Sequence, residues 1–152
     1  MTLRLRLRRA RIKSEYWTIR QIDEEHFDPD GWDPRSASAL WVVTDTTTDE
    51  LCAFAAADWH VEHNVQDGQP GPWQSWIDLT RCAILPDYRG QGLQRRLIRA
   101  RLRWGKKLGA RIATTFTIDN PTSARNLVRC GFVEFSPGGE RHEGARYWRK
   151  DL

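Results

Sequence analysis

The stretch that decides the fold reads Asp87-Tyr88-Arg89-Gly90-Gln91-Gly92-Leu93-Gln94-Arg95-Arg96-Leu97. It follows an apolar run, Ile77 to Leu85, that predicts a strand, and it leads into an arginine-rich helix. Gly90 and Gly92 allow the backbone to approach a ligand closely, with its N–H groups turned toward that ligand. The helix that follows adds unpaired N–H donors and the positive end of its dipole. This arrangement predicts a site for the pyrophosphate of a cofactor.

Two other phosphate-binding loops are excluded by the residues around these glycines. No lysine lies between Asp87 and Arg103, so the Gly-Lys-Ser/Thr nucleotide loop is absent. The three-glycine dinucleotide turn is absent too, because no third glycine follows Gly92. The pattern resembles instead the coenzyme A loop of the GNAT superfamily of N-acetyltransferases, usually written Arg/Gln-x-x-Gly-x-Gly/Ala. Gln94 stands where the family has a small residue. Its side chain could crowd the pyrophosphate, although it need not block donation by the backbone N–H groups.

A second segment carries the same resemblance. It follows a β-branched run, Ile112 to Ile118, and reads Asn120-Pro121-Thr122-Ser123-Ala124-Arg125-Asn126-Leu127-Val128-Arg129-Cys130-Gly131-Phe132. It resembles the segment after the fifth strand of the superfamily, and its Asn-x-x-Ser start is similar to the ribosomal-protein acetyltransferase branch. Asn120 suits an N-cap, Pro121 a first helical turn and Gly131 a C-terminal cap. Together the two motifs cover roughly the second half of the chain.

The resemblance implies that acetyl-CoA is the acyl donor. The cofactor-binding residues that it implies are Ala83, Ile84, Leu85, Arg89, Gly90, Gln91, Gly92, Leu93, Gln94, Arg95, Asn120 and Ser123. Main-chain groups of residues 83–85 would align the pantetheine arm, Asn120 would contact it, and the two arginines would reach the phosphates. Simpler roles stay open, because Asn120 also serves as an N-cap and the arginines also suit a plain surface.

Acyl transfer to an amine needs a base for the amine and a proton for the departing thiolate. Asp78 is the one carboxylate of the strand from Ser75 to Ile84, five residues before Ala83. This placement resembles the histone acetyltransferase branch, which carries its catalytic Glu at that register. The resemblance implies that Asp78 is the base, acting through a bridging water because its side chain is one carbon shorter. An ion pair of Asp78 with an arginine such as Arg81 or Arg101 is an equal alternative.

The proton donor has no direct counterpart. Many members of the superfamily carry a tyrosine on the helix after the fifth strand, where this chain has Leu127 and Val128. Tyr147 is the first substitute, followed by Tyr88 and Ser123, and solvent could also protonate the thiolate.

Other reactive and aromatic side chains receive simpler interpretations. Cys52, Cys82 and Cys130 have no paired or metal-like spacing, so reduced thiols are expected, with Cys82 and Cys130 buried and inert. His60 and His63 have no third ligand nearby, so no metal is expected and they are placed at the rim of the acceptor cleft. Four tryptophans could line an aromatic acceptor pocket, although packing explains most tryptophans. These are Trp32, Trp59, Trp73 and Trp76.

Composition and charge limit the class of protein. The chain has 152 residues and a net charge of +4, and it contains no apolar run long enough for a membrane. We therefore expect one domain, residues 1–152, in a soluble, cytoplasmic protein without a membrane partner. From Arg89 to Lys107 there are eight basic and no acidic residues, whereas from Asp23 to Asp33 there are six acidic residues and no lysine or arginine. The acidic stretch would attract a cationic amine near a cleft, although a solvated loop is the commoner role.

Hydrophobic periodicity predicts the order of elements. Strands are expected at residues 3–9, 40–44, 51–60, 73–85, 111–118, 132–136 and 146–151, with helices at 92–108 and 121–130 and a polar loop at 62–72. One further helix is allowed before Arg35. The fold class is α/β (mixed α+β): a GNAT-like central sheet, mixed but mostly antiparallel and flanked by helices. Its pyrophosphate loop lies between the fourth strand and the following helix.

The function expected from these patterns is acetyl transfer from acetyl-CoA to a primary amine by direct attack in a ternary complex. The partner is an amine-bearing acceptor, either a protein or a small molecule, and nucleic acid is not expected. A homodimer is compatible with the final run, residues 147–150, if this run forms a sheet edge. Two alternatives stay open: a non-enzymatic basic module that binds nucleic acid or an acidic protein, and a GNAT scaffold that binds coenzyme A without catalysis.

Overall fold

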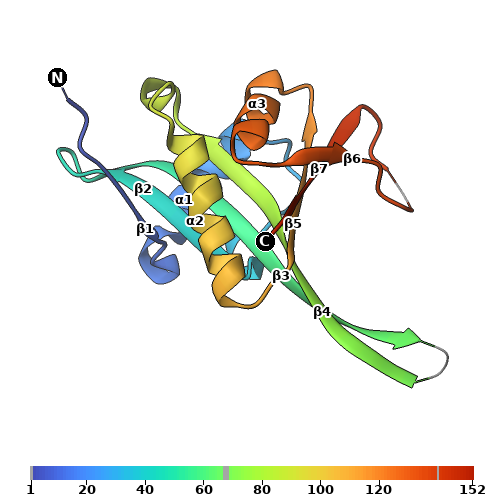
Figure 1. Ribbon diagram of the computed structural model, residues 1–152. Helices are drawn as coiled ribbons and strands as arrows, with labels where there is room; N and C mark the ends of the chain where they lie inside the picture. The colour runs from blue at the N-terminus through green and yellow to red at the C-terminus, as the bar shows by residue number, and fades with distance from the viewer. Residues whose placement is uncertain (1, 67–68, 140) are drawn as a thin grey trace. The chain divides into compact units, whose positions relative to one another are not determined.

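The structure is a computed structural model that describes residues 2–66, 69–139 and 141–152, with side chains except at residues 63–66 and 69–73. The elements, in chain order, are β1 (Leu5–Arg9), α1 (Ile12–His26), η1 (Pro34–Ser36), β2 (Ala39–Asp45), β3 (Glu50–Gln66), β4 (Gln69–Ile84), η2 (Pro86–Tyr88), α2 (Leu93–Lys107), β5 (Ile112–Ile118), α3 (Pro121–Arg129), β6 (Val133–Phe135) and β7 (Ala145–Asp151) (Figure 1). The described strands form one seven-stranded sheet in the order β1-β2-β3-β4-β5-β7-β6.

The sheet confirms the predicted fold class. Strand β4 pairs with β5 in parallel, whereas β1–β2, β2–β3, β5–β7 and β6–β7 are antiparallel. The glycine-containing loop lies between β4, the fourth strand, and α2, as predicted. A mixed, mostly antiparallel sheet follows from hairpin connections in the first half of the chain and helical connections in the second.

The chain divides into two compact units. The first comprises Met1–Asp58 and Thr80–Leu97, and the second comprises Trp59–Leu79 and Ile98–Leu152. Strands β3 and β4 and helix α2 are continuous through both units. The expectation of a single domain stays a prediction.

The core of the first unit forms between α1 and strands β2 to β4. Ile19 and Ile22 lie three residues apart on α1, and therefore on one side of the helix. They are buried together with Leu40, Val42, Leu51, Phe54, Ala56 and Ala83. Arg8 on β1 binds the first turn of α1, since its guanidinium donates to both carboxylate oxygens of Glu15 at 2.9 and 2.6 Å. This contact lowers the pKa of Glu15 and raises that of Arg8.

In the second unit, α2 packs closely on β4. A Cβ built on Gly105 would lie 2.6 Å from Cδ1 of Ile77, so the glycine is what allows this approach. Helix α3 ends as predicted: Asn120 Oδ1 accepts the N–H of Ser123 at 3.0 Å, Pro121 occupies the first turn, and Gly131 adopts a φ of +90° beyond the last turn. The Phe132 N–H then returns to the carbonyl of Leu127 at 3.0 Å, which completes the C-terminal cap.

Two expectations about the secondary structure need correction. The polar loop at 62–72 is wrong, because β3 continues to Gln66 and β4 begins at Gln69; residues 67 and 68 lie outside the described residues. Strand pairing uses main-chain groups, so polar composition does not by itself end a strand. The helix that was allowed before Arg35 is present, as the 15-residue α1. The last strand, β7, is not an edge, because it lies between β5 and β6. The homodimer itself stays a prediction.

Candidate functional site

The loop between β4 and α2 has the backbone that its glycines predict. Gly90 has a φ of +76° and Gly92 a φ of +71°, in the left-handed region that other residues rarely adopt. Nothing lies within 4 Å of a Cβ built on Gly90, so the space beside this glycine is not occupied by any described residue. Two main-chain hydrogen bonds stabilise the turn that precedes the loop. The N–H groups of Tyr88 and Arg89 donate to the carbonyls of Leu85 and Pro86 at 3.0 and 3.2 Å, respectively.

The amide groups of this loop are free to bind an anion. Within the described part of the chain, the N–H groups of Gly90, Gln91, Gly92 and Leu93 have no hydrogen-bond acceptor. The first N–H group of α2 used within the helix backbone is that of Arg96, which donates to the carbonyl of Gly92 at 3.2 Å. Consecutive unpaired N–H groups at the start of a helix form a cradle that fits a pyrophosphate.

The side chains around the loop are placed as follows. A guanidinium nitrogen of Arg95 lies 3.6 Å from the position of a Gly92 Cβ, so this cation stands at the loop. Arg89 folds back instead, and its Nε donates to the carbonyl of Ile84 at 3.1 Å. Gln94 is partly exposed on the first turn of α2. One main-chain group predicted to align the pantetheine is already used, since the N–H of Leu85 donates to the carbonyl of Cys52 at 2.9 Å.

In the second unit, the side-chain oxygen of Asn120 is used as a hydrogen-bond acceptor, but its side-chain NH₂ group is not used as a donor among the described residues. Its Oδ1 caps α3 through Ser123, which is the simpler of the two roles considered for it. No acceptor for its side-chain N–H groups is present among the described residues. Capping therefore leaves Asn120 able to donate to a ligand.

Asp78 lies in a polar cluster of the second unit rather than in an ion pair with Arg81. Its Oδ2 is 2.8 Å from Nε2 of His60, and its Oδ1 accepts the hydroxyl of Thr114. The His60 ring stacks on Trp76, with the centroids 5.0 Å apart and the planes inclined by 18°. The Asp78 side chain is 36% exposed, so it is held in place and still open to solvent.

The tyrosines considered as proton donors differ in their surroundings. Tyr147 on β7 is half-buried beside Phe116 and Phe135, and its hydroxyl oxygen accepts the N–H of His142 at 2.8 Å. Tyr88 is buried in the first unit, where its hydroxyl lies 3.0 Å from Glu50 and 3.3 Å from Asp45. Burial, followed by the hydrogen bond to Glu50, raises the pKa of Tyr88 to about 12. Tyr88 is therefore a poor proton donor at neutral pH.

Arg81 is the centre of a second cluster, in the first unit. Its guanidinium lies over the rings of Phe27 and Trp32, at 4.7 and 5.3 Å from their centroids. Its Nε is 3.6 Å from a carboxylate oxygen of Asp23, and a terminal nitrogen bonds Asp30. Asp23 is buried, and burial raises its pKa despite Arg81. Asp30, exposed and bonded by the N–H of Trp32 and then by Arg81, has a lowered pKa.

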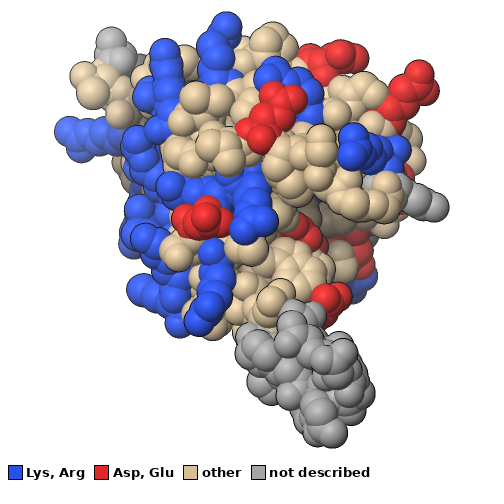
Figure 2. All heavy atoms as spheres, turned by 45° about the vertical axis from the view of Figure 1, so that its right-hand side comes forward, with Lys and Arg blue, Asp and Glu red and all other residues tan. Residues whose placement is uncertain are grey.

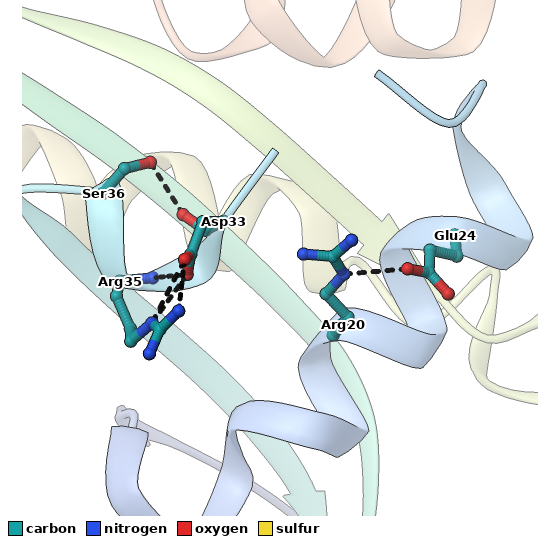
Figure 3. A network of polar contacts seen from close by, with 5 residues as sticks. All are labelled: Arg20, Glu24, Asp33, Arg35 and Ser36. Atoms are coloured by element: carbon teal, nitrogen blue, oxygen red, sulfur yellow. Dashed lines mark hydrogen bonds and ion pairs between the residues drawn. The ribbon is translucent and has the colours of Figure 1, made fainter. Parts of the chain in front are cut away.

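The acidic stretch is largely neutralised within the protein. Figure 3 shows Asp33 bonded to the guanidinium and the N–H of Arg35, beside the pair formed by Arg20 and Glu24 on α1. The Arg35 contacts lower the pKa of Asp33 to about 2. Together with the two carboxylates bound by Arg81, these pairs account for four of the six acidic residues, Asp23, Glu24, Asp30 and Asp33. The solvated-loop role therefore fits this stretch better than a free anionic patch.

The cysteines depart from the prediction. All three are free thiols, but only Cys52 is buried, whereas Cys82 and Cys130 are partly exposed. Cys130 sits at the C-cap of the short helix α3, where the chain reaches the surface. Burial raises the pKa of Cys52 to about 11.

The predicted aromatic pocket stays a prediction. Trp32 belongs to the first unit and stacks on Phe54, while Trp76 belongs to the second and stacks on His60. Trp59 is 41% exposed. The side chains of Trp73 and His63 lie outside the described residues. Where side chains are described, no cluster of three or more His, Cys, Asp or Glu could hold a metal ion.

The outer face of α2 carries only positive charge. Arg96, Arg99, Arg103, Lys106 and Lys107 are exposed, and none of them has an ion-pair or hydrogen-bond partner in the described part of the protein. Figure 2 shows lysine and arginine side chains gathered along the left of one face. Arg101, the basic residue in the apolar arc, is buried instead. In the described residues, no helix is both long and apolar enough to span a membrane.

The contact between His60 and Asp78 was not predicted from the sequence. His60 was expected at the rim of the acceptor cleft, which stays a prediction, and its ring lies against Asp78, the predicted base. The available signal was the hairpin itself, because strands that fold back on each other bring residues at equal distances from the turn together. Because β3 ends at Gln66 and β4 begins at Gln69, residues around 60 fall opposite those around 75.

Comparisons with known proteins agree with this picture. A model of the acetyltransferase (GNAT) family matches residues 7–132. No curated protein sequence matches the chain significantly.

Solved structures with low identity share the fold. NAA60 of Arabidopsis thaliana in complex with acetyl-CoA superposes with a TM-score of 0.76 at 15% identity, covering 98% of this chain and 100% of that one. The NatC complex bound to Gag peptide and CoA gives 0.77 at 10% identity, covering 99% of each chain. The mosquito arylalkylamine N-acetyltransferase like 5b gives 0.70 at 15% identity, covering 98% of this chain and 100% of that one.

Proposed function

Because this chain belongs to the acetyltransferase (GNAT) family, we propose that it is an acetyl-CoA-dependent N-acetyltransferase acting on a primary amine of a protein or small molecule. The observation that carries the proposal is the loop at Gly90 and Gly92, whose N–H groups have no acceptor among the described residues. Several solved relatives of the same fold are described as complexes with acetyl-CoA or CoA, which supports the choice of cofactor.

The residues of the loop fit the cofactor. The N–H groups from Gly90 to Leu93 would hold the pyrophosphate, and Arg95 would add a positive charge beside it. Gln94 is partly exposed at the first turn, so its side chain has room to point away from the cradle. Asn120 would donate its side-chain N–H to the pantetheine arm while its Oδ1 continues to cap α3. When bound, acetyl-CoA supplies the thioester that the amine attacks.

Asp78 is the proposed base for the acceptor amine. Its carboxylate is held through both oxygens, by His60 and Thr114, and is still accessible, as a positioned base requires. Tyr147 is the proposed proton donor, because it is half-buried on β7 and its hydroxyl hydrogen has no acceptor among the described residues.

The test begins with acetyl-CoA binding by calorimetry. Gly90→Ala should weaken binding at least tenfold, because an alanine at positive φ distorts the loop and directs a methyl group into the ligand space. Gly109→Ala is the matched control, since Gly109 has a φ of +81° and open space but lies beyond the end of α2. Both variants should lose similar stability, and only Gly90→Ala should lose affinity. Absence of binding to the wild-type protein at millimolar acetyl-CoA would refute the proposal.

Turnover is then measured as release of free coenzyme A thiol with a panel of primary amines and peptides. Asp78→Asn should lower kcat by about 10²–10⁴-fold, the usual range for a positioned base, while acetyl-CoA affinity is kept. Binding without turnover on any amine would favour the scaffold that only binds coenzyme A.

A second function, binding to a polyanion, has one specific observation in its favour. Five cations without a partner among the described residues follow one face of α2, with no acidic residue among them. If this face binds nucleic acid, affinity for a short duplex should fall steeply between 50 and 200 mM salt, as counterion release requires. Substitution of Arg99 and Arg103 by Gln should remove most of that binding and leave acetylation unchanged.

A further inference from the structure

His60 and Asp78 form a pair in which each side chain is also held by a second contact. The two atoms that face each other, His60 Nε2 and Asp78 Oδ2, are 2.8 Å apart. Each partner is also fixed on its other side, His60 by the stacked ring of Trp76 and Asp78 by the hydroxyl of Thr114. Three of these residues come from adjacent strands β4 and β5, where Trp76 pairs with Ile112 and Asp78 with Thr114.

The pair is open to solvent on the imidazole side. The His60 side chain is 42% exposed, compared with 36% for Asp78. Because Nε2 faces the carboxylate, Nδ1 is the ring nitrogen left over, and no described residue bonds to it. An imidazole oriented by a carboxylate through one nitrogen can exchange a proton through the other.

The chemistry of acetyl transfer requires such an exit. An ammonium acceptor loses two protons when it becomes an amide, and the departing thiolate takes up one of them. One proton per turnover must therefore leave the site. A carboxylate that has accepted it cannot serve again until the proton has moved on.

We propose that His60 is the residue through which Asp78 passes this proton to solvent. The Asp78 carboxylate accepts the proton from the acceptor amine. With the imidazole hydrogen on Nδ1, the lone pair of Nε2 takes this proton over from Asp78, and Nδ1 releases its own hydrogen to water. Proton exchange between the exposed ring and water then returns the hydrogen from Nε2 to Nδ1 before the next transfer from Asp78. His60 thus acts through Asp78 and does not touch the amine, which makes it a positioning and relay residue. The inference rests on the proposed acetyltransferase function and adds to it the route of the proton.

The charged groups around the pair are few. On the same face of the sheet, Thr114 lies opposite Arg149, which bonds Asp151 at 3.2 Å. On β3, Asp58 and Glu62 lie two residues before and after His60, and Asp58 accepts the N–H of Ser38 at 3.0 Å. Asp78 is thus the one carboxylate bonded to the imidazole among the described residues.

The kinetic test uses His60→Gln, which keeps an N–H donor for Asp78 but cannot relay a proton. We expect kcat to fall at least tenfold, the KM for the amine to change less than twofold, and the pH profile of kcat to change. High concentrations of an imidazole buffer should restore part of kcat, because His60 lies within reach of solvent. His26→Gln is the control, since His26 belongs to the first unit, where it bonds the carbonyl of Ile22 at the end of α1.

A second readout does not depend on turnover. Nitrogen NMR of the neutral imidazole should place the His60 proton on Nε2 in the resting wild type and lose that preference in Asp78→Ala, which has no side-chain acceptor. An active wild type with unchanged kcat and pH profile in His60→Gln would overturn the relay alone. Retention of the Nε2–H preference in Asp78→Ala would overturn the pairing. An inactive wild type would instead refute the proposed function.

Discussion

Replacing Gly105 by alanine is expected to destabilise the protein, although alanine is the better helix former. In an exposed helical position the change from glycine to alanine stabilises by about 1 kcal/mol. At Gly105, however, the new Cβ would lie 2.6 Å from Cδ1 and 3.2 Å from Cγ1 and Cγ2 of Ile77. Ordinary carbon contacts lie at about 3.5–4.0 Å, so three atoms would be too close at once.

The size of the destabilisation depends on whether Ile77 can move away from the added methyl group. Ile77 has 0% exposure, so its side chain cannot turn toward solvent and α2 or β4 must shift. Overpacking of this kind destabilises by about 1–3 kcal/mol, and the short distance favours the upper end. After subtraction of the gain in helix propensity, we expect Gly105→Ala to lower the free energy of unfolding by about 2 kcal/mol. The corresponding fall in Tm is about 4–8 °C for a chain of this size.

The assay is urea unfolding followed by tryptophan fluorescence, with a double-mutant cycle. Ile77→Val removes Cδ1, the nearest atom, and should by itself lower stability by about 1 kcal/mol. The double variant should be more stable than the sum of the two single effects, by about 1 kcal/mol or more. Arg99→Ala compared with Arg99→Gly measures the alanine preference at an exposed site of the same helix. A Gly105→Ala variant as stable as the wild type would refute the packing argument.

Other predictions concern the buried charges and the thiols. Arg81→Met should lower the free energy of unfolding by about 3–5 kcal/mol at pH 7, because it leaves the Asp23 carboxylate buried without a cation. Since the pKa of Asp23 is raised, its protonated form suits the fold, and the loss should be smaller near pH 4 in urea titrations. Tyr88 has a folded pKa of about 12 against an ordinary value of 10.0, so wild-type stability should fall as pH rises through this interval, and Tyr88→Phe should lose that component of the slope. In thiol labelling at pH 8, folded Cys52, with its pKa of about 11, should react more slowly than Cys82; equal rates would contradict the burial seen here.

Local signals predicted the parts of the fold that depend on neighbouring residues. The turn at Gly90 and Gly92 was predictable because left-handed backbone selects glycine, and the ends of α3 were predictable because Asn120 and Gly131 satisfy the helix termini. Strand β7 was misplaced at an edge, because strand order depends on pairing between distant segments. The extension of β3 and β4 was missed because main-chain pairing tolerates polar side chains.

The candidate site was predictable only in part, because its contacts also join segments that are distant in the sequence. Asp78 could be selected as the one carboxylate of its strand, but its partner could not, because His60 lies 18 residues earlier on another strand. Arg81 was considered as a partner of Asp78, which is close in sequence. It binds Asp23 and Asp30 instead, because those carboxylates and the rings of the 27–32 segment surround its guanidinium.

The Arg81 cluster has a consequence for how this sequence can change over evolution. Two carboxylates, at positions 23 and 30, share the one cation at position 81, which lies far from them in the chain. Loss of any one of the three leaves a remaining charge less well compensated. Substitutions there are tolerated best when they occur together, for example a neutral residue at 81 with a neutral residue at 23. Among divergent relatives these positions should therefore vary jointly, whereas the exposed cations of α2 should drift independently of one another.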